Sequence, residues 1–157
     1  MKKIAIFVDV QNIYYTTRDT YKRQFNYRRF WPRIEAEGDI TIANAYATHR
    51  GDDQQIKFQD ALKHIGFSVK LKPFIQRSDG SAKGDWDVGI TIDVLEAAPL
   101  VDKVILLSGD GDFDRLLEKI KHTYSVETAV YGVKKLTAAS LIDAADDFYA
   151  IDETMLI

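Results

Sequence analysis

The sequence predicts one α/β domain, a three-layer α/β/α sandwich with a mainly parallel central sheet, spanning residues 1–157. Short apolar runs rich in Ile and Val recur along the chain, as expected for strands that are buried on both faces. Segments with apolar residues at helical spacing separate these runs. Because strands that alternate with crossover helices form a parallel sheet, we expect helices to cover both faces of that sheet.

Six segments are expected to form strands. The runs "KIAIFV" and "KVILLS" are apolar almost throughout, which indicates central strands, whereas "FSVKLKPF" alternates with polar residues and indicates a strand near an edge. The expected strands cover 3–8, 39–48, 67–74, 103–108, 126–132 and 148–151.

Helices are expected between these strands, and residues 76–85 are expected to form a polar loop. Pro32 suits the first turn of the helix expected over 30–37, and Gly66 is expected to end the helix over 53–65. In the fourth helix, we expect Val88, Ile92 and Leu95 to form the core-facing stripe. The expected helices cover 12–20, 30–37, 53–65, 86–98, 113–121 and 136–145.

The amino-acid composition limits the cellular compartment and the class of protein to which the chain can belong. A hydrophobic fraction of 46% is too high for a disordered chain, and the absence of cysteine excludes disulfides and thiolate metal sites. Asp9 interrupts the first apolar run before it reaches the length of a secretion signal, and no stretch approaches the roughly 20 apolar residues that cross a bilayer. We therefore expect a soluble cytoplasmic protein with no membrane partner.

The net charge of −3 does not suggest nucleic-acid binding, but the charges are unevenly distributed. The segment from Arg18 to Arg33, here called the basic segment, contains a single acid, Asp19. Its six basic residues are Arg18, Lys22, Arg23, Arg28, Arg29 and Arg33. A local basic surface of this kind can bind phosphates despite a negative total charge. Aromatic residues interleave with the bases over 14–31; Tyr14, Phe25, Phe30 and Trp31 are expected mostly to pack into the core.

Aspartates follow two of the expected central strands. Asp9 ends the first strand, and Asp110 and Asp112 follow the fourth in "LLSGDGDF". Sites in open parallel sheets lie outside the carboxyl ends of the strands at the topological switch point, so these carboxylates are expected to converge. Capping of the helix near Phe113 would explain one aspartate but not all of them.

A second acidic segment is "KGDWDVGITIDVL". Asp85 is a natural N-cap, and Asp87 lies in the first helical turn, where the helix dipole favours a carboxylate. Asp93 has apolar neighbours and needs a partner or a cation if it is buried. Lys83 or a backbone amide would serve as that partner, and a functional role for Asp93 is the alternative.

Clustered carboxylates favour a metal ion. Two unit charges about 4 Å apart repel by about 4 kcal/mol at an effective dielectric constant near 20, so the cluster needs protons or a cation. Oxygen ligands without cysteine suit Mg²⁺ or Mn²⁺. Such an ion activates water and stabilises charge on phosphate oxygens, which points to phosphoryl chemistry. The three histidines fall in no ligand spacing.

Three segments together resemble NYN domains of the PIN-like ribonuclease superfamily, and especially their LabA-like branch. They are "FVDVQNIYY", "KGDWDVGITIDVL" and "LLSGDGDFDRLL", in the family's order and spacing apart from the inserted Trp86. The resemblance spans nearly the whole chain. It implies a PIN-like, Rossmann-like sandwich and a metal-dependent nuclease that acts on RNA.

The resemblance also implies residue roles. The catalytic and metal-binding acids would be Asp9, Asp87, Asp110 and Asp112. Asn12 would orient substrate or water, with capping of the first helix as its alternative role. Supporting residues would be Ser108, Lys83 and Asp93, and the basic residues named above would bind RNA.

We therefore expect a ribonuclease that cleaves single-stranded RNA with Mg²⁺ or Mn²⁺. The alternative is a catalytically silent RNA-binding or regulatory module that keeps the acidic site. A haloacid-dehalogenase-like phosphatase is disfavoured because Gln11 stands where its second acid belongs, and an EF-hand is disfavoured because Arg115 replaces the loop glycine. The sequence does not determine the RNA target, the mode of cleavage, the number of metals or whether the protein forms a homodimer.

Overall fold

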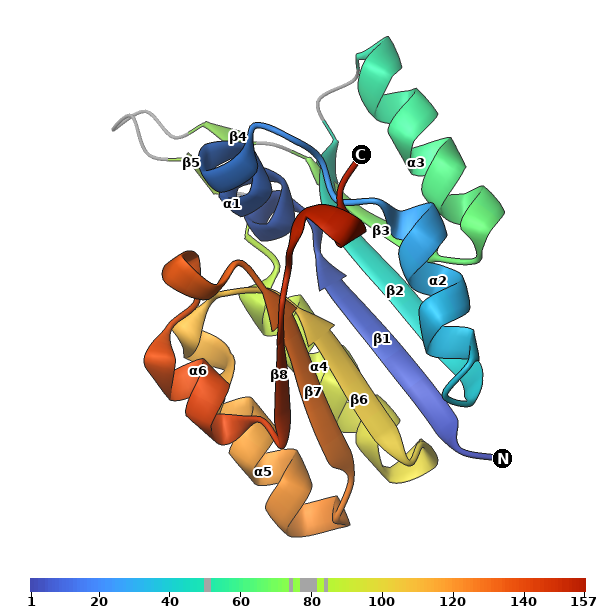
Figure 1. Ribbon diagram of the computed structural model, residues 1–157, viewed down its shortest axis with the longest axis vertical. Coiled ribbons are helices and arrows are strands. Elements are labelled where there is room, and N and C mark those ends of the chain that lie inside the picture. Colours follow the sequence, from blue (N-terminus) through green and yellow to red (C-terminus); the bar gives the residue numbers. More distant parts are fainter. Residues whose placement is uncertain (50–51, 74, 77–81, 84) are drawn as a thin grey trace.

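The computed structural model describes residues 1–49, 52–73, 75–76, 82–83 and 85–157. A six-stranded sheet forms the centre of the molecule, with helices on both faces (Figure 1). All neighbouring strands of this sheet pair in parallel, which confirms the predicted three-layer α/β fold. The strands are β1 (Lys3–Asp9), β2 (Asp39–His49), β3 (Ser68–Pro73), β6 (Lys103–Leu107), β7 (Glu127–Gly132) and β8 (Asp147–Ala150).

The strand order is β3-β2-β1-β6-β7-β8. The chain builds outward from β1 to β3 on one side and returns to the centre at β6 before it builds outward again. The point between β1 and β6 is therefore the topological switch point of a doubly wound sheet. β3 is an edge strand, as its polar alternation predicted. Within the expected polar loop, β4 (Ile75–Gln76) and β5 (Ala82–Lys83) instead pair as a short antiparallel ribbon.

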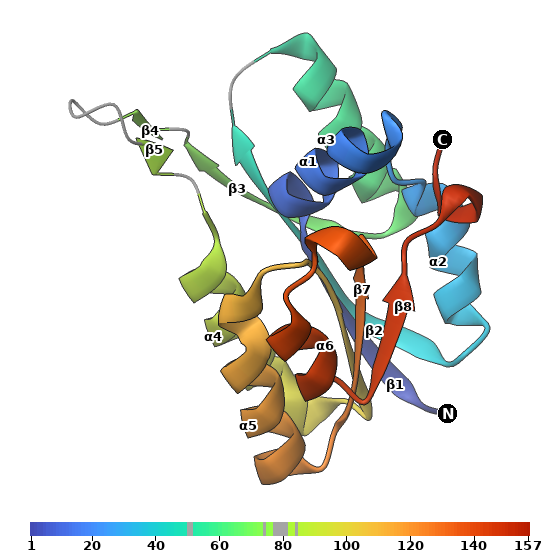
Figure 2. The same cartoon turned by 60° about the vertical axis from the view of Figure 1, so that its left-hand side comes forward.

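Three helices cover each face of the sheet, and the rotated view in Figure 2 separates the two groups. One core contains residues of the first three helices with Ile4, Ile6 and Val8 of β1, and the opposite core contains residues of the last three with Ala5 and Phe7. The helices are α1 (Val10–Tyr21), α2 (Tyr27–Glu35), α3 (Asp53–Ile65), α4 (Asp87–Ala97), α5 (Asp114–Tyr124) and α6 (Ala139–Ala144). In the described part of the chain, no helix is both long and apolar enough to cross a membrane.

Capping residues explain where the helices begin and where one prediction fails. The Asn26 side chain accepts a hydrogen bond from the Arg29 amide, so α2 begins at Tyr27 and not near Phe30. Pro32 therefore lies inside the helix and not in its first turn. Gly66 ends α3 at a φ of 138°, a conformation that favours glycine, as expected from the sequence.

The core-facing stripe predicted for α4 is wrong for Val88 and Ile92, although Leu95 is partly buried and packs against the core. The buried residues are Ile90, Val94 and Ala97, whereas Val88 and Ile92 are 71% and 51% exposed. The observed stripe has the same helical spacing as the predicted stripe but lies two residues further along the chain. Because α4 is apolar on most of its surface, the pattern alone did not decide which stripe faces the sheet.

Two further expectations need correction. Tyr14 is 45% exposed and is not a core residue, although Phe25 and Phe30 are buried as expected. The helix expected over 136–145 is divided into a 3₁₀ turn at Lys134–Leu136 and the short α6. The 3₁₀ turn Gly111–Phe113 likewise precedes α5.

Candidate acidic site at the carboxyl edge of the sheet

The switch point brings together residues that are distant in the sequence. β1 and β6 are paired up to Val8 and Leu107, so Asp9 and Ser108 follow side by side at the carboxyl edge of the sheet. The loop after β6 carries Asp110 and Asp112 at this edge. The edge therefore collects acidic residues from two central strands, as the sequence predicted.

Ser108 and Asn12 connect the two loops. The Ser108 hydroxyl lies 3.3 Å from an Asp9 carboxylate oxygen and accepts a hydrogen bond from the Asp110 amide at 3.1 Å. The Asn12 side-chain oxygen accepts a hydrogen bond from the Gly109 amide at 2.9 Å. Asp9, and not Asn12, caps α1, because its carboxylate accepts from the Asn12 amide at 3.4 Å. Asn12 thus ties α1 to the aspartate loop.

Gly109 allows a close approach that sequence reasoning missed. Its carbonyl accepts a hydrogen bond from the Ala138 amide at 3.1 Å, and a β-carbon at this position would lie 2.6 Å from the Leu136 carbonyl oxygen. The glycine in "SGDGD" therefore lets the segment before α6 press against the aspartate loop and fix its path. Only the tertiary fold reveals this contact.

Trp86 positions the third acidic element, α4. Its indole nitrogen donates a hydrogen bond to the Ala47 carbonyl at 2.9 Å, and its ring packs against Tyr46 with centroids 5.3 Å apart. Asp85 accepts a hydrogen bond from the Asp87 amide at 3.2 Å, although Trp86 is the residue at the N-cap position itself. Trp86, which in the sequence was only an insertion between two acids, attaches the start of α4 to β2.

Three carboxylates converge at this edge. Asp87, Asp110 and Asp112 each offer an oxygen atom, and these atoms all lie within 4.8 Å of one another. Asp87 and Asp110 are half-buried, and Asp112 is exposed. Asp110 also accepts a hydrogen bond from the Asp112 amide at 2.9 Å, so its capping role coexists with its place in the cluster. Asp9 is not one of these three, but it lies within electrostatic reach of the cluster.

Two of the acids at this edge, Asp87 and Asp9, have raised pKa values. Burial, then a hydrogen bond and the charge of Asp110, raise the pKa of Asp87 to about 7. Burial raises the pKa of Asp9 to about 6, against the hydrogen bonds from Asn12 and Ser108 that lower it. Among the residues that the structure describes, no lysine or arginine forms an ion pair with any of these four acids. An all-oxygen donor set with uncompensated negative charge fits a hard divalent cation.

The structure places the expected supporting residues differently. Asp93 accepts a hydrogen bond from the Tyr46 hydroxyl at 2.7 Å, and Asn44 donates to that hydroxyl at 3.1 Å. Tyr46 is thus the partner that the described residues provide for Asp93. Burial and the bond to Asp93 raise the pKa of Tyr46. The side chain of Lys83 lies outside the described residues.

The six basic residues of the segment from Arg18 to Arg33 are all exposed. Some also make intramolecular contacts. Arg23 donates hydrogen bonds to the carbonyls of Leu156 and Ile157, and Arg29 donates to the Thr154 carbonyl at 3.3 Å. The guanidinium of Arg18 lies 4.9 Å from the ring centre of Tyr15. Part of the basic segment therefore stabilises the fold, and its binding to RNA stays a prediction.

The doubly wound parallel sheet and the acidic residues at its switch point define an α/β protein with a candidate divalent-metal site. The chain belongs to the NYN domain family, whose model matches residues 3–152. It is LabA-like within that family: it is 30% identical to the "Low amplitude and bright protein LabA" of Synechococcus elongatus, over 96% of this chain and 84% of that protein. The resemblance inferred from the three sequence segments is confirmed.

A solved structure supports the fold in detail. The crystal structure of a protein of unknown function from Vibrio parahaemolyticus superposes with a TM-score of 0.95 at 54% sequence identity. The match covers 99% of this chain and 96% of that chain.

Proposed function

We propose that the protein is a metal-dependent ribonuclease that hydrolyses phosphodiester bonds of single-stranded RNA in the cytoplasm. The observation that carries this proposal is the set of three carboxylates, Asp87, Asp110 and Asp112, with oxygen atoms within 4.8 Å of one another and no ion pair to a described basic residue. The family supports the same reading, because NYN domains have a PIN-like nuclease fold.

The three clustered aspartates would hold Mg²⁺ or Mn²⁺. Such an ion, when bound, supplies an activated water and stabilises negative charge on the phosphate. Asp9 would act as a fourth acid at the margin of the cluster, since the hydrogen bond of Ser108 fixes its carboxylate there. Asn12 would act as a positioning residue by holding the aspartate loop through the Gly109 amide.

The basic segment would bind the phosphates on either side of the cleaved bond. Lys22, Arg28 and Arg33 are the exposed members whose side chains form no hydrogen bond or ion pair with a described residue, so they are suited to bind an external phosphate. Arg18, Arg23 and Arg29 would contribute through their remaining donors. Association into a homodimer is a further prediction, which sedimentation analysis tests.

The decisive experiment compares cleavage of a labelled single-stranded RNA with and without Mn²⁺. We expect wild-type cleavage to require the metal, and Asp110→Asn and Asp9→Asn to lower its rate by about 100-fold or more. Asp60→Asn, an exposed position on α3, is the matched control and should cleave normally. Cleavage that is equal in all four proteins would reject the nuclease assignment. RNA binding without cleavage in the wild type would instead support the silent binding module.

A further inference from the structure

A pocket of about 570 Å³ lies between α1 and α3, next to the acidic site. The segment before α2 and the end of β2 complete its walls. This volume is in the range of sites that hold small molecules or parts of larger ligands, about 300–1,000 Å³. The chain has six glutamines, and five of them line this single pocket: Gln11, Gln24, Gln54, Gln55 and Gln59.

The lining of the pocket excludes a phosphate as the preferred occupant. Asp52 is the one charged side chain among the described residues that line it, and its carboxylate caps α3 by accepting a hydrogen bond from the Gln55 amide at 2.8 Å. The remaining lining residues are amides, aromatic rings, aliphatic groups and the hydroxyl residue Thr48. An uncharged group with a flat ring and several hydrogen-bonding atoms matches this composition.

Gln59 is the strongest indication that the pocket has a ligand. The residue is only 6% exposed, and its side-chain amide has no hydrogen-bond partner among the described residues. It lines the pocket and offers one donor and one acceptor side by side. Among the described residues, Thr20 Oγ1 is the one fully buried side-chain atom without a hydrogen-bond partner, so the Gln59 amide is open to the pocket. A ligand that bonds to both amide groups would replace the water there and gain affinity.

The pocket lies between the acidic site and the basic segment. Val10 and Gln11 line it and directly follow Asp9 in the chain. Tyr27 also lines it, and the charge of Asp9 adds to the effect of burial in raising the pKa of Tyr27, which places the two side chains within electrostatic reach. Gln24 and Tyr27 belong to the basic segment itself. A strand whose phosphate reaches the acids would pass the mouth of this pocket.

We propose that the glutamine-lined pocket receives one unstacked base of the RNA strand. The proposal rests on the function proposed above. Single-stranded RNA is recognised through bases that stack on aromatic side chains and whose edges form hydrogen bonds with polar groups. Glutamine amides suit base edges because they pair a donor with an acceptor. Phe58 and Tyr14, on opposite walls, offer the aromatic surface.

Binding measurements without divalent metal test the pocket independently of cleavage. A fluorescent uridine oligomer and an abasic ribose-phosphate oligomer of equal length serve as probes, with EDTA present. We expect the wild type to bind the base-bearing oligomer about 10-fold more tightly, and Gln59→Leu to reduce that preference by about 5-fold or more. Uridine monophosphate alone should bind more weakly than the oligomer, because the phosphate contacts are missing.

Two variants guard against misfolding and chance effects. Gln54→Ala changes an exposed part of the pocket and should reduce the same preference by about 2-fold to 3-fold, whereas Ile56→Ala, on the outer side of α3, should leave it unchanged. Equal binding of both oligomers by the wild type would overturn the proposal, as would a full preference in Gln59→Leu or a mononucleotide that binds as tightly as the oligomer. If the protein shows the preference but cleaves no RNA, the base-binding pocket is supported and the nuclease assignment is rejected.

Discussion

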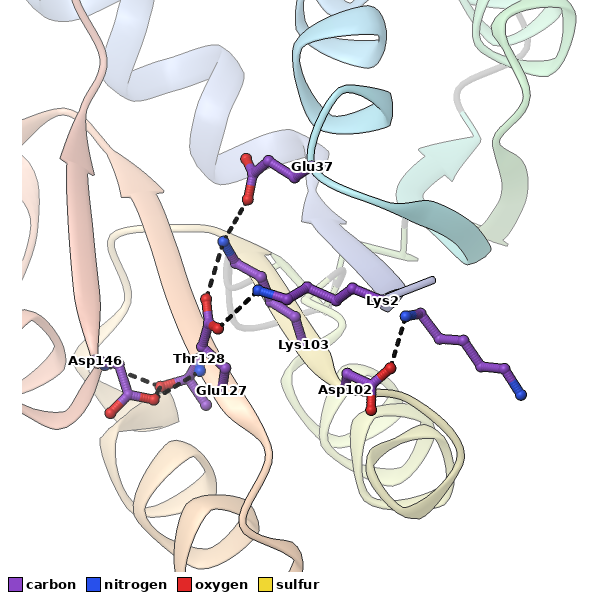
Figure 3. A network of polar contacts seen from close by, with 8 residues as sticks. Lys2, Glu37, Asp102, Lys103, Glu127, Thr128 and Asp146 are labelled. Carbon is purple, nitrogen blue, oxygen red and sulfur yellow. Dashed lines mark hydrogen bonds and ion pairs between the residues drawn. The ribbon is translucent and has the colours of Figure 1, made fainter.

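The central sheet has charged side chains at both of its ends, and the two ends balance that charge differently. At the amino end, Lys103 at the start of β6 has a side chain that is only 3% exposed, and its Nζ lies 2.6 Å from Glu37 and 3.2 Å from Glu127 (Figure 3). Lys2 forms a second ion pair with Glu127 at 3.1 Å. Burial disfavours the charged amine, but the two carboxylates outweigh it and raise the pKa of Lys103.

At the carboxyl end, four acids gather and the described residues provide no matching cation. Burial raises the pKa of Asp9 to about 6, and burial with the neighbouring Asp110 raises that of Asp87 to about 7. At the amino end the opposite holds, because hydrogen bonds from Lys2 and Lys103 outweigh burial and lower the pKa of Glu127. The described residues thus pair the charges at the amino end, which stabilises the fold, and provide no counter-charge at the carboxyl end, which we assign to catalysis.

The largest effect is expected from removing the acids of the amino end. Glu37→Gln combined with Glu127→Gln leaves the buried Lys103 without a counter-charge, which should lower the free energy of unfolding by about 2–3 kcal/mol. Urea unfolding at pH 7 measures this. The control is Glu96→Gln with Glu118→Gln, two exposed glutamates that should change stability by less than about 0.5 kcal/mol. A double variant as stable as this control would show that the network does not hold the amine.

The pH dependence of stability is expected to reveal the unpaired acids at the carboxyl end of the sheet. An aspartate with a raised pKa holds its proton in the folded state between pH 4 and 7 but loses it in the unfolded state, so the metal-free protein should lose stability as pH rises through this range. After allowance for solvent screening, the loss is about 1–2 kcal/mol. Urea unfolding in EDTA from pH 4 to pH 8 measures it. Stability that rises steadily over this interval would contradict the assigned pKa shifts.

Neutralising one acid of the cluster should stabilise the metal-free protein. Asp87→Asn removes a repelled charge, and we expect an increase in unfolding free energy of about 1 kcal/mol at pH 8 and no increase at pH 4, where the aspartate is already protonated. Thermal unfolding in EDTA compares it with Asp60→Asn, which should be neutral at both pH values. A decrease at pH 8 would mean that the Asp87 charge is compensated within the chain.

The smallest effect concerns the basic segment. Arg28→Ala combined with Arg29→Ala should weaken binding of single-stranded RNA by about 3-fold to 10-fold and reduce the slope of log affinity against log salt by about 1. Lys57→Ala combined with Lys119→Ala removes the same charge from exposed positions outside the segment. If both double variants have the same affinity and slope, the segment is not the RNA-binding surface.

Much of the fold and the location of the candidate site could be predicted from the sequence. All six strands of the main sheet were predicted. The central strands β1 and β6 were the clearest, because strands buried on both faces have little freedom in composition. The rule that sites lie beyond the carboxyl ends of parallel strands predicted that Asp9, Asp110 and Asp112 meet at one edge, and the family resemblance added Asp87. In the structure, Asp87, Asp110 and Asp112 form the cluster and Asp9 lies beside it.

Other features depend on tertiary packing. The orientation of α4 was not predictable because two apolar stripes with equal spacing compete, and the Trp86 anchor to β2 decides between them. The contact of Gly109 with the segment before α6 joins residues whose local sequence gives no sign of it. Likewise, the glutamines at 11, 24 and 59 are scattered in sequence and become one wall only in the folded chain.

The most direct test of the divalent site is the stabilisation of the protein by Mn²⁺ at pH 8. The ion should raise the unfolding free energy of the wild type by about 2.7 kcal/mol when its concentration is 100 times the dissociation constant. Asp110→Asn, which removes a charge from the centre of the cluster, should lose most of this response at the same concentration. If Mn²⁺ leaves the wild type unchanged, or stabilises both proteins equally, the three carboxylates do not share a cation.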